Sequence, residues 1–223
     1  MIPLRDHNPS GKVPVVTYTL IALNVLVFLY TFLLPGDLLE EFISAFALTP
    51  AVVVQGYGLL TFLTSMFLHG SVGHILGNML FLNIFGDNLE DRLGHFRYLL
   101  YYLACGLGAS FLQILVNPHS QVPMLGASGA IAGLMGGYLV LFPQEEIDVL
   151  FSFGWTLRQV TVPAYSMLFY WFLAQLLSGV GALGSFDSGG VAYFAHIGGF
   201  VTGAALILPF KHQGRIENIR TPL

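Results

Sequence analysis

The sequence Gly-Ala-Ser-Gly at 126–129 suits acyl transfer. It follows a polar loop and precedes an apolar segment, so Ser128 stands at the expected start of a helix. The free N–H groups and the positive dipole end at such a start can stabilise a developing oxyanion, and glycines let a substrate backbone approach. Ser128 is therefore a candidate nucleophile. The alternative is structural, namely a serine that caps the helix among small residues that permit close packing.

A serine nucleophile needs a base to accept its proton. Lys12 and Lys211 are the only lysines, and both flank apolar segments, which excludes a Ser–Lys mechanism. His196 lies about one turn into the last apolar segment. Glycines at 199 and 203, and small residues along 129–137, predict that two helices pack closely and bring Ser128 near His196. The alternative is a histidine that only hydrogen-bonds between helices.

A third polar cluster contains His69, His74 and Asn78. His74 and Asn78 are four residues apart and share one helical face. Both side chains can donate hydrogen bonds without introducing a fixed charge, so they suit an oxyanion hole. The alternative is polar side chains that hold helices together.

Three histidines also raise the possibility of zinc. His69 and His74 are five residues apart, however, and the chain has no H-E-x-x-H pattern or nearby cysteine ligand. We therefore expect no metal and no other cofactor.

The composition indicates which kind of element positions these residues. Hydrophobic residues make up 55% of the chain and charged residues 9%, with a mean hydropathy of +0.74, whereas soluble domains carry about 25% charged residues. The chain is therefore expected to be a membrane protein in contact with the lipid bilayer. The net charge of −4 and eight scattered Lys and Arg argue against nucleic acid as a partner.

Segments with few charges mark the expected spans, because a charge at the bilayer centre costs about 2.5 to 3.5 kcal/mol on insertion scales. They predict six helices, at 15–34, 72–89, 95–116, 128–142, 160–179 and 191–210. The fold class expected is all-α, a six-transmembrane-helix bundle forming a single membrane domain over residues 1–223.

Lysine and arginine accumulate in cytoplasmic segments, and all eight fit one topology. They lie before the first span, around the second connection, in the fourth connection and after the sixth span, at Arg5, Lys12, Arg92, Arg97, Arg158, Lys211, Arg215 and Arg220. We expect an integral protein of the cell membrane with both termini cytoplasmic. Ser128 would then face the outer side.

The segment 37–71 between the first two spans is too long for a tight turn and too apolar for a solvated loop. We expect an outer insertion that is partly embedded in the membrane. Irregular backbone at that depth is tolerated only against protein or a water-filled cavity, so the insertion is expected to flank such a cavity.

Three motifs occur in order on three different spans: H-x-x-x-x-H-x-x-x-N at 69–78, G-x-S-G at 126–129 and A-H-x-G-G at 195–199. In this the chain resembles the rhomboid family of intramembrane serine proteases, over nearly its whole length. Two features depart from the pattern of many members. The Trp-Arg pair before the second span is replaced by Gln-Gly-Tyr-Gly-Leu at 55–59, and Ala132 stands where some relatives place an aromatic under the histidine.

The resemblance implies a rhomboid-like bundle that hydrolyses peptide bonds in or near the transmembrane segments of membrane protein substrates. Ser128 and His196 would form a dyad without a carboxylate. His74, Asn78 and the Ser128 backbone N–H would line the oxyanion hole, and His69 would support the outer insertion.

A substrate helix must be admitted between the spans before it can be cut. The fifth span is the expected gate, because Trp171 and Phe172 are bulky and glycines follow. Ordinary lipid-facing aromatics are the alternative.

Two other functions stay open. A catalytically inactive rhomboid-like protein that binds membrane clients predicts a missing serine or histidine. A small transporter predicts polar residues through both halves of the bilayer, whereas here they cluster in the outer half.

Overall fold

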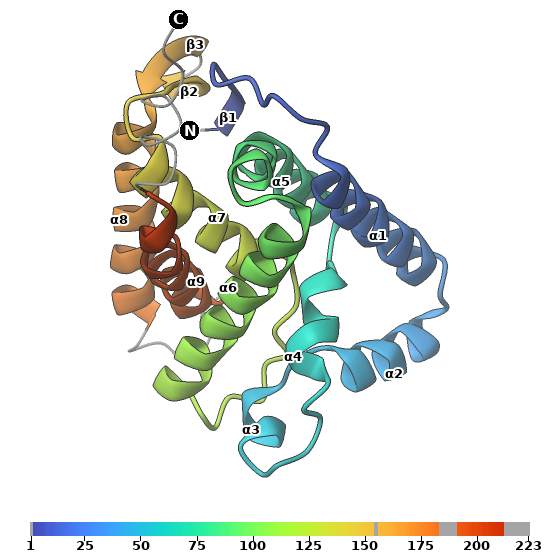
Figure 1. Ribbon diagram of the computed structural model, residues 1–223. Helices are drawn as coiled ribbons and strands as arrows, with labels where there is room; N and C mark the ends of the chain where they lie inside the picture. The colour runs from blue at the N-terminus through green and yellow to red at the C-terminus, as the bar shows by residue number, and fades with distance from the viewer. Residues whose placement is uncertain (1, 154–155, 183–190, 212–223) are drawn as a thin grey trace, which may run out of the picture.

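The computed structural model describes residues 2–153, 156–182 and 191–211, and this part of the chain is mostly helical (Figure 1). The helices are α1 (Val15–Phe32), α2 (Gly36–Phe46), α3 (Pro50–Val53), α4 (Thr61–Thr64), η1 (Ser65–Phe67), α5 (Val72–Leu93), α6 (His95–Val116), α7 (Ser128–Leu141), α8 (Ala164–Ala182), α9 (Tyr193–Leu206) and η2 (Leu208–Phe210). The strands are β1 (Ile2–Asp6), β2 (Glu146–Phe153) and β3 (Thr156–Pro163).

Three stretches of the described chain are long and apolar enough to cross a membrane, judged by length and composition: Val15–Phe32, His95–Val116 and Tyr193–Phe210. The helix Ser128–Leu141 is apolar but shorter. Each of the six predicted spans falls largely on one helix, in order α1, α5, α6, α7, α8 and α9. Arg215 and Arg220, which entered the topology prediction, lie outside the described residues.

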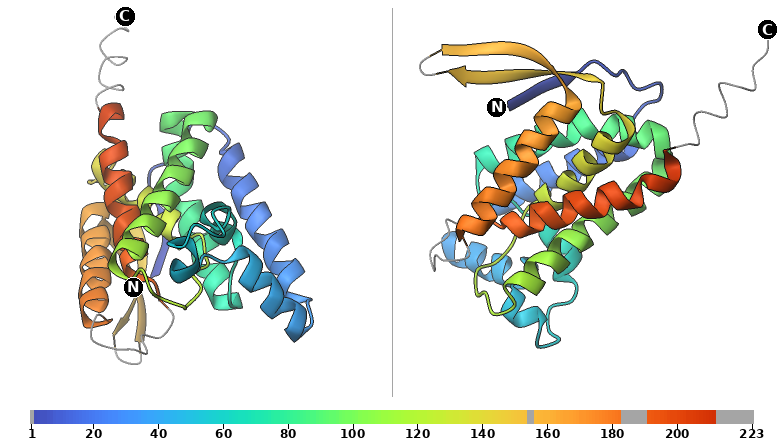
Figure 2. Two further views of the ribbon diagram at one scale, coloured as in Figure 1. Left: turned by 90° about the horizontal axis from the view of Figure 1, so that it is seen from below. Right: turned by 90° about the vertical axis from the view of Figure 1, so that its left-hand side faces the viewer.

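The expectation of an all-α protein needs correction, because the structure contains an antiparallel sheet in the order β1-β2-β3. It lies across one end of the helices (Figure 2). The predicted fifth span began too early, since residues 160–163 pair with β2 and α8 begins at Ala164. Hydropathy misplaced this boundary because residues 160–163 carry no charge. Residues 90–93, predicted to be outside the second span, continue α5.

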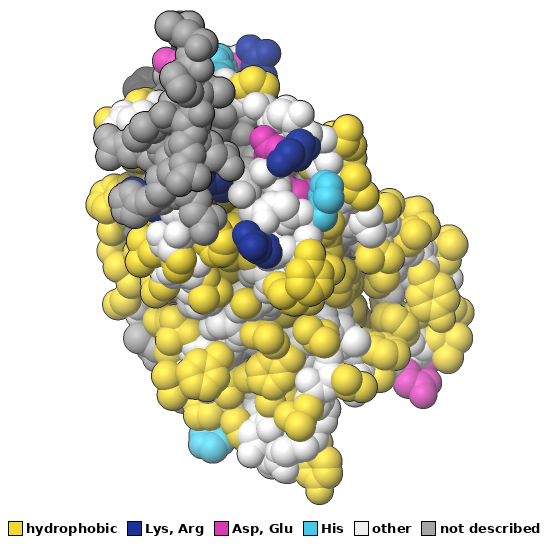
Figure 3. Space-filling view, in the orientation of Figure 1, with side chains coloured by type: hydrophobic (Ala, Val, Ile, Leu, Met, Phe, Trp, Pro, Cys, Tyr) yellow, Lys and Arg dark blue, Asp and Glu magenta, His cyan; other side chains and the backbone are white. Residues whose placement is uncertain are grey.

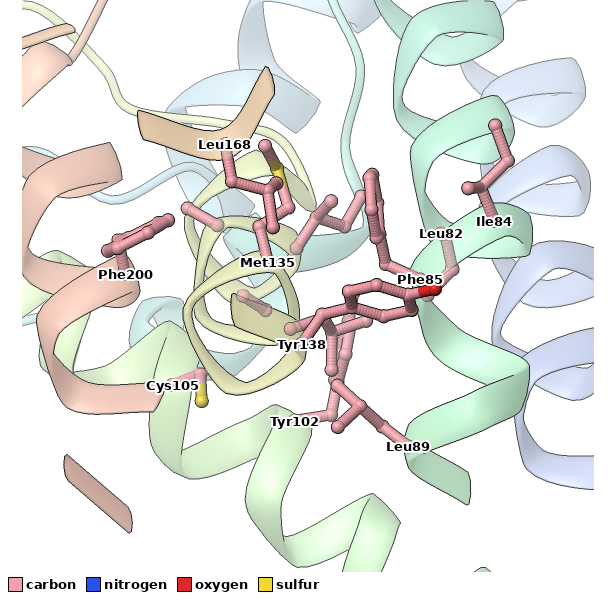
Figure 4. Close-up of a cluster of buried hydrophobic side chains, with 14 of the residues drawn as sticks. Leu82, Ile84, Phe85, Leu89, Tyr102, Cys105, Met135, Tyr138, Leu168 and Phe200 are labelled. Atoms are coloured by element: carbon pink, nitrogen blue, oxygen red, sulfur yellow. The ribbon is translucent and has the colours of Figure 1, made fainter. Parts of the chain in front are cut away.

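Helix α7 lies at the centre of the bundle. All ten of its residues from Gly129 to Tyr138 are buried, as expected of a helix that is apolar all round. Its side chains meet those of the surrounding helices, such as Phe85 of α5, Tyr102 of α6, Leu168 of α8 and Phe200 of α9 (Figure 4).

Helices α7 and α9 pack closely, because Gly136 of α7 and Gly199 and Gly203 of α9 leave no side chain between the two backbones. A Cβ on Gly199 would collide with the carbonyl oxygen of Gly129, and a Cβ on Gly203 would collide with that of Gly133. The predicted close packing of these two helices is confirmed. Small residues let two backbones approach in this way.

The segment from α2 to η1 lies at the end of the molecule opposite the sheet (Figure 1). Leu48 exchanges two backbone hydrogen bonds with Met124, at 3.0 and 2.7 Å, and the N–H of Gly126 donates to the carbonyl of Ser65 at 2.9 Å. The insertion is therefore joined to the loop that leads into α7.

At the sheet end, the carboxylate of Glu90 fixes α1 against α5. It accepts hydrogen bonds from the backbone N–H groups of Val16 and Thr17 at 2.8 and 2.7 Å, and from the Thr17 hydroxyl at 2.7 Å. These N–H groups belong to the first turn of α1, where a negative charge is stabilised by the unpaired donors and the helix dipole.

Candidate active site

Ser128 and His196 lie within hydrogen-bond distance, with 2.8 Å between Ser128 Oγ and His196 Nε2. Ser128 is the first residue of α7, and His196 is on the first turn of α9. The two residues are 68 positions apart in sequence and meet because α7 and α9 touch through their glycines. The expected proximity of the two side chains is confirmed.

The capping alternative for Ser128 is not supported. The N-cap residue of α7 is Ala127, and no side chain caps this helix. The Ser128 hydroxyl instead faces His196. Just before it, Gly126 has φ +127°, a conformation that favours glycine, and a Cβ there would lie 2.8 Å from His74 Nε2. The turn into α7 therefore depends on a glycine at this position.

Helix α8 contributes two further contacts to His196. Gln175 Oε1 lies 2.8 Å from His196 Nδ1, and the Trp171 ring lies 5.9 Å from the His196 ring, between centroids. Sequence reasoning missed Gln175. The available signal was an amide in the middle of an otherwise apolar span, because a polar side chain placed there needs a partner.

His74 and Asn78 lie on α5 next to the turn that carries Ser128. Their side-chain nitrogens, His74 Nε2 and Asn78 Nδ2, are 2.8 and 3.6 Å from the point where a Cβ of Gly126 would be. Asn78 is buried, and its Nδ2 lies 2.8 Å from His69 Nε2. The amide nitrogen has two hydrogens, so one can bond to His69 while the other is available to a ligand.

These residues share one cavity of about 970 Å³. Its wall includes His74 and Asn78 of α5, Ser128 of α7, and His196 of α9. Residues 119–125 of the loop before α7 and Trp171 and Gln175 of α8 complete much of the wall. A serine, an imidazole and neutral hydrogen-bond donors in one cavity can carry out nucleophilic attack on a carbonyl.

No group of three or more His, Cys, Asp or Glu side chains arranged to hold a metal ion occurs among the described residues. His69 and His196 instead have uncharged hydrogen-bonding partners, Asn78 for His69 and Ser128 and Gln175 for His196.

Comparison with known proteins identifies the family. A family model described as the rhomboid domain matches residues 57–213, most of the chain. This protein belongs to the rhomboid family. It is therefore an integral membrane protein. Members of this family are generally serine intramembrane proteases.

Several curated rhomboid proteins are similar to the chain. It is 35% identical over 170 residues to RHOMBOID-like protein 6, mitochondrial, of Arabidopsis thaliana, covering 75% of this chain and 50% of the relative. It is 36% identical over 173 residues to RHOMBOID-like protein 4 of the same plant, covering 76% and 39%. It is 31% identical over 201 residues to Rhomboid protease GluP of Bacillus subtilis (strain 168), covering 90% and 36%. The chain thus spans half or less of the length of these relatives.

The expected gate residues of this rhomboid protein face α9. Phe172 packs against Phe200 with 4.7 Å between ring centroids, and Trp171 lies against both Phe200 and His196. Ala132, at the position where some relatives place an aromatic, is fully buried within α7. The aromatic contact to His196 is therefore made from α8.

The α7–α9 contact generates a test. Gly199→Ala should separate the two helices, since its Cβ has no room against Gly129, and should slow labelling of Ser128 by a fluorophosphonate at least about tenfold, because a displacement of about 1 Å can cost on the order of 10² in rate. Gly181→Ala is the control, because no atom lies within 4 Å of its Cβ position. Equal labelling rates of the two variants in detergent would contradict this account.

Proposed function

We propose that this protein is a serine intramembrane protease, with transmembrane proteins as its substrates and Ser128 and His196 as a catalytic dyad. The observation that carries the proposal is the 2.8 Å contact between Ser128 Oγ and His196 Nε2 at the wall of the large cavity. Family membership supports the reaction class.

In the proposed reaction, Ser128 Oγ attacks the carbonyl carbon of the scissile peptide bond while His196 Nε2 takes the hydroxyl proton. The carbonyl oxygen becomes an oxyanion. His196 then gives the proton to the leaving amine as the C–N bond breaks, which leaves an acyl ester on Ser128. Water, deprotonated by the same nitrogen, hydrolyses the ester and restores the serine.

The oxyanion requires donors that do not move during the reaction. We assign this role to His74, the second N–H of Asn78 and the backbone N–H of Ser128, which is unpaired because Ser128 begins α7. His69 supports this set from the outer insertion, because it is buried and holds the Asn78 amide through its Nε2. The cavity, about 970 Å³ in volume, provides a route for water.

We propose six spans with both termini on the cytoplasmic side of the cell membrane. The described basic residues support this orientation because they gather at the sheet end. Lys12 lies 3.8 Å from Asp91, Arg92 donates to the carbonyl of Phe210 at 2.9 Å, and Arg5 pairs with Asp148 of β2 at 2.7 Å. Figure 3 displays the Lys and Arg of this face at that end only, with hydrophobic side chains over most of the remainder.

The wall of the cavity includes Pro50 of the insertion and residues 119–125 of the loop that is joined to it, and the insertion lies at the end opposite the sheet (Figure 1). In this orientation the site opens to the outer side, and the insertion is the partly embedded segment expected from the sequence. Substrates would then be cut near the outer ends of their transmembrane segments.

Two alternatives are less well supported. A client-binding protein without activity has no need of a serine in contact with a histidine. A small transporter needs polar side chains along a path through the bundle, whereas α7, at the centre, is filled by apolar and small residues from Gly129 to Tyr138.

The dyad is tested by removing each member. Ser128→Ala and His196→Ala should each abolish cleavage of a transmembrane reporter substrate in proteoliposomes, and the double variant should be no worse than either, since nucleophile and base act as a unit. Near-normal cleavage by either single variant, with folding verified by circular dichroism, would refute the assignment.

The oxyanion donors should contribute in a graded way. His74→Ala and Asn78→Ala should each lower kcat by up to about 10² to 10³, the range for loss of one such donor, while Ser128 still reacts partly with a fluorophosphonate. Gln55→Ala is the polar control, because Gln55 belongs to the outer insertion and does not line the cavity. If His74→Ala and Asn78→Ala both leave turnover unchanged, the two side chains have only a structural role.

We further propose that substrates are admitted between α5 and α8, since both helices contribute to the cavity wall. Phe172→Ala should remove one α8 contact with Phe200 and speed cleavage of a transmembrane substrate, while Trp171 and Gln175 still hold His196, so that fluorophosphonate labelling stays at the wild-type rate. Trp171→Ala should instead slow labelling, because Trp171 also contacts His196. A pure gate role for Trp171, as expected from the sequence, would instead predict faster cleavage and unchanged labelling for this variant. If Phe172→Ala leaves the cleavage rate unchanged, admission past α8 is not rate-limiting and the gate assignment fails.

A further inference from the structure

Helix α8 holds His196 through two side chains on one of its faces. Trp171 and Gln175 are four residues apart, so they project from the same side of the helix. Trp171 packs against the imidazole ring, and Gln175 Oε1 lies 2.8 Å from Nδ1, the ring nitrogen that does not face Ser128. Both nitrogens of His196 therefore have a defined partner.

These two partners are compatible with one neutral tautomer of His196. To accept the Ser128 proton, Nε2 must carry a lone pair, and the ring proton must then be on Nδ1. An N–H at Nδ1 needs an acceptor. The amide oxygen of Gln175 is an acceptor at hydrogen-bond distance, and it stabilises this tautomer over the one with the proton on Nε2.

Soluble serine proteases often place a carboxylate beside the catalytic histidine. Within a membrane span, a glutamine is less costly to bury at this position than a carboxylate. An ionised side chain within a span is costly unless it is paired. The amide oxygen accepts a hydrogen bond without adding a charge, and its dipole still stabilises the positive ring that forms when His196 takes the proton.

We propose that Gln175 is a positioning residue that holds His196 in its proton-accepting tautomer and ring orientation. The inference rests on the proposed function, in which His196 is the general base. Since Gln175 and Trp171 are both on α8, an outward displacement of that helix removes both contacts from His196. The alignment of the base therefore depends on the position of the helix past which substrates are admitted.

The alternative is that Gln175 only joins α8 to α9. That role predicts a loss of stability when the hydrogen bond is removed, and no change in which ring nitrogen of His196 carries the proton. The two roles are separated by reading the tautomer directly.

The first measurement compares reaction rates. Gln175→Leu keeps the approximate size of the side chain and removes the acceptor. It should lower both kcat and the rate of fluorophosphonate labelling of Ser128 about three- to tenfold, the range for one neutral hydrogen bond, with a smaller change in KM. Gln175→Glu keeps an oxygen acceptor and should react faster than Gln175→Leu.

The matched control is Leu177→Ala, which truncates an exposed side chain two residues further along α8. It should leave labelling at the wild-type rate. The inference fails if Gln175→Leu is labelled as fast as wild type, or if Gln175→Glu is no faster than Gln175→Leu.

The second measurement is nitrogen NMR of protein carrying ¹⁵N-labelled histidine in detergent micelles, with the His196 signals assigned by their loss in His196→Ala. Wild type and Gln175→Glu should show the proton on Nδ1, and Gln175→Leu should show a shift toward Nε2. An unchanged tautomer in Gln175→Leu would overturn the inference. This measurement does not require turnover. If the wild-type protein cleaves no transmembrane reporter, the proposed function fails while the tautomer result still decides the role of Gln175.

Discussion

The contact between α7 and α9 is the constraint on which the arrangement of the site depends. Ser128 and His196 come from helices far apart in sequence, and their side chains are short, so they can meet only if the two backbones nearly touch. The glycines at 136, 199 and 203 permit this approach, since a Cβ at any of them would collide with a backbone carbonyl of the facing helix. Van der Waals contacts between the closely packed helices then hold them in place. In a membrane, where helix association depends on close packing and interhelical hydrogen bonds, small residues make such contact possible.

The side chains that hydrogen-bond to one another in the site are all uncharged when its histidines are neutral. The side chains that hydrogen-bond to Ser128, His196 and Asn78 are imidazoles, an amide and a hydroxyl. This composition follows from the solvent, because an ionised group far from water is costly while a neutral donor or acceptor needs only one partner. The buried carboxylate of Glu90 is satisfied differently, by the N–H groups of the first turn of α1 at the sheet end of the bundle. Neutral groups thus surround the cavity, and the charged contacts among the described residues concentrate at the other end.

The outer insertion and the loop before α7 form one unit with the site. Backbone hydrogen bonds join Leu48 to Met124 and Gly126 to Ser65, and His69 holds Asn78. The turn into Ser128 is therefore fixed from outside the bundle as well as by α7 itself. Helix α8, in contrast, contacts the base through Trp171 and Gln175 and also bounds the cavity. The side of the site toward α5 and α7 is built on the tightly packed part of the molecule, and the side toward α8 is built on the helix that we propose as the gate.

The sequence by itself determined the membrane class, the approximate positions of six long helices, and four polar residues of the cavity wall, Ser128, His196, His74 and Asn78, because hydropathy, lone polar residues in apolar segments and glycine spacing are local signals. It also indicated that the helices of Ser128 and His196 would touch. The sequence could not locate the sheet, since residues 160–163 have the same hydropathy in a strand as in a span and only pairing with β2 distinguishes the two. It did not assign Gln175 to His196, or Asn78 to His69, because a hydrogen bond between distant segments depends on which helix faces are turned toward each other. That choice is made by the packing of the whole bundle, which the spacing along one helix does not specify.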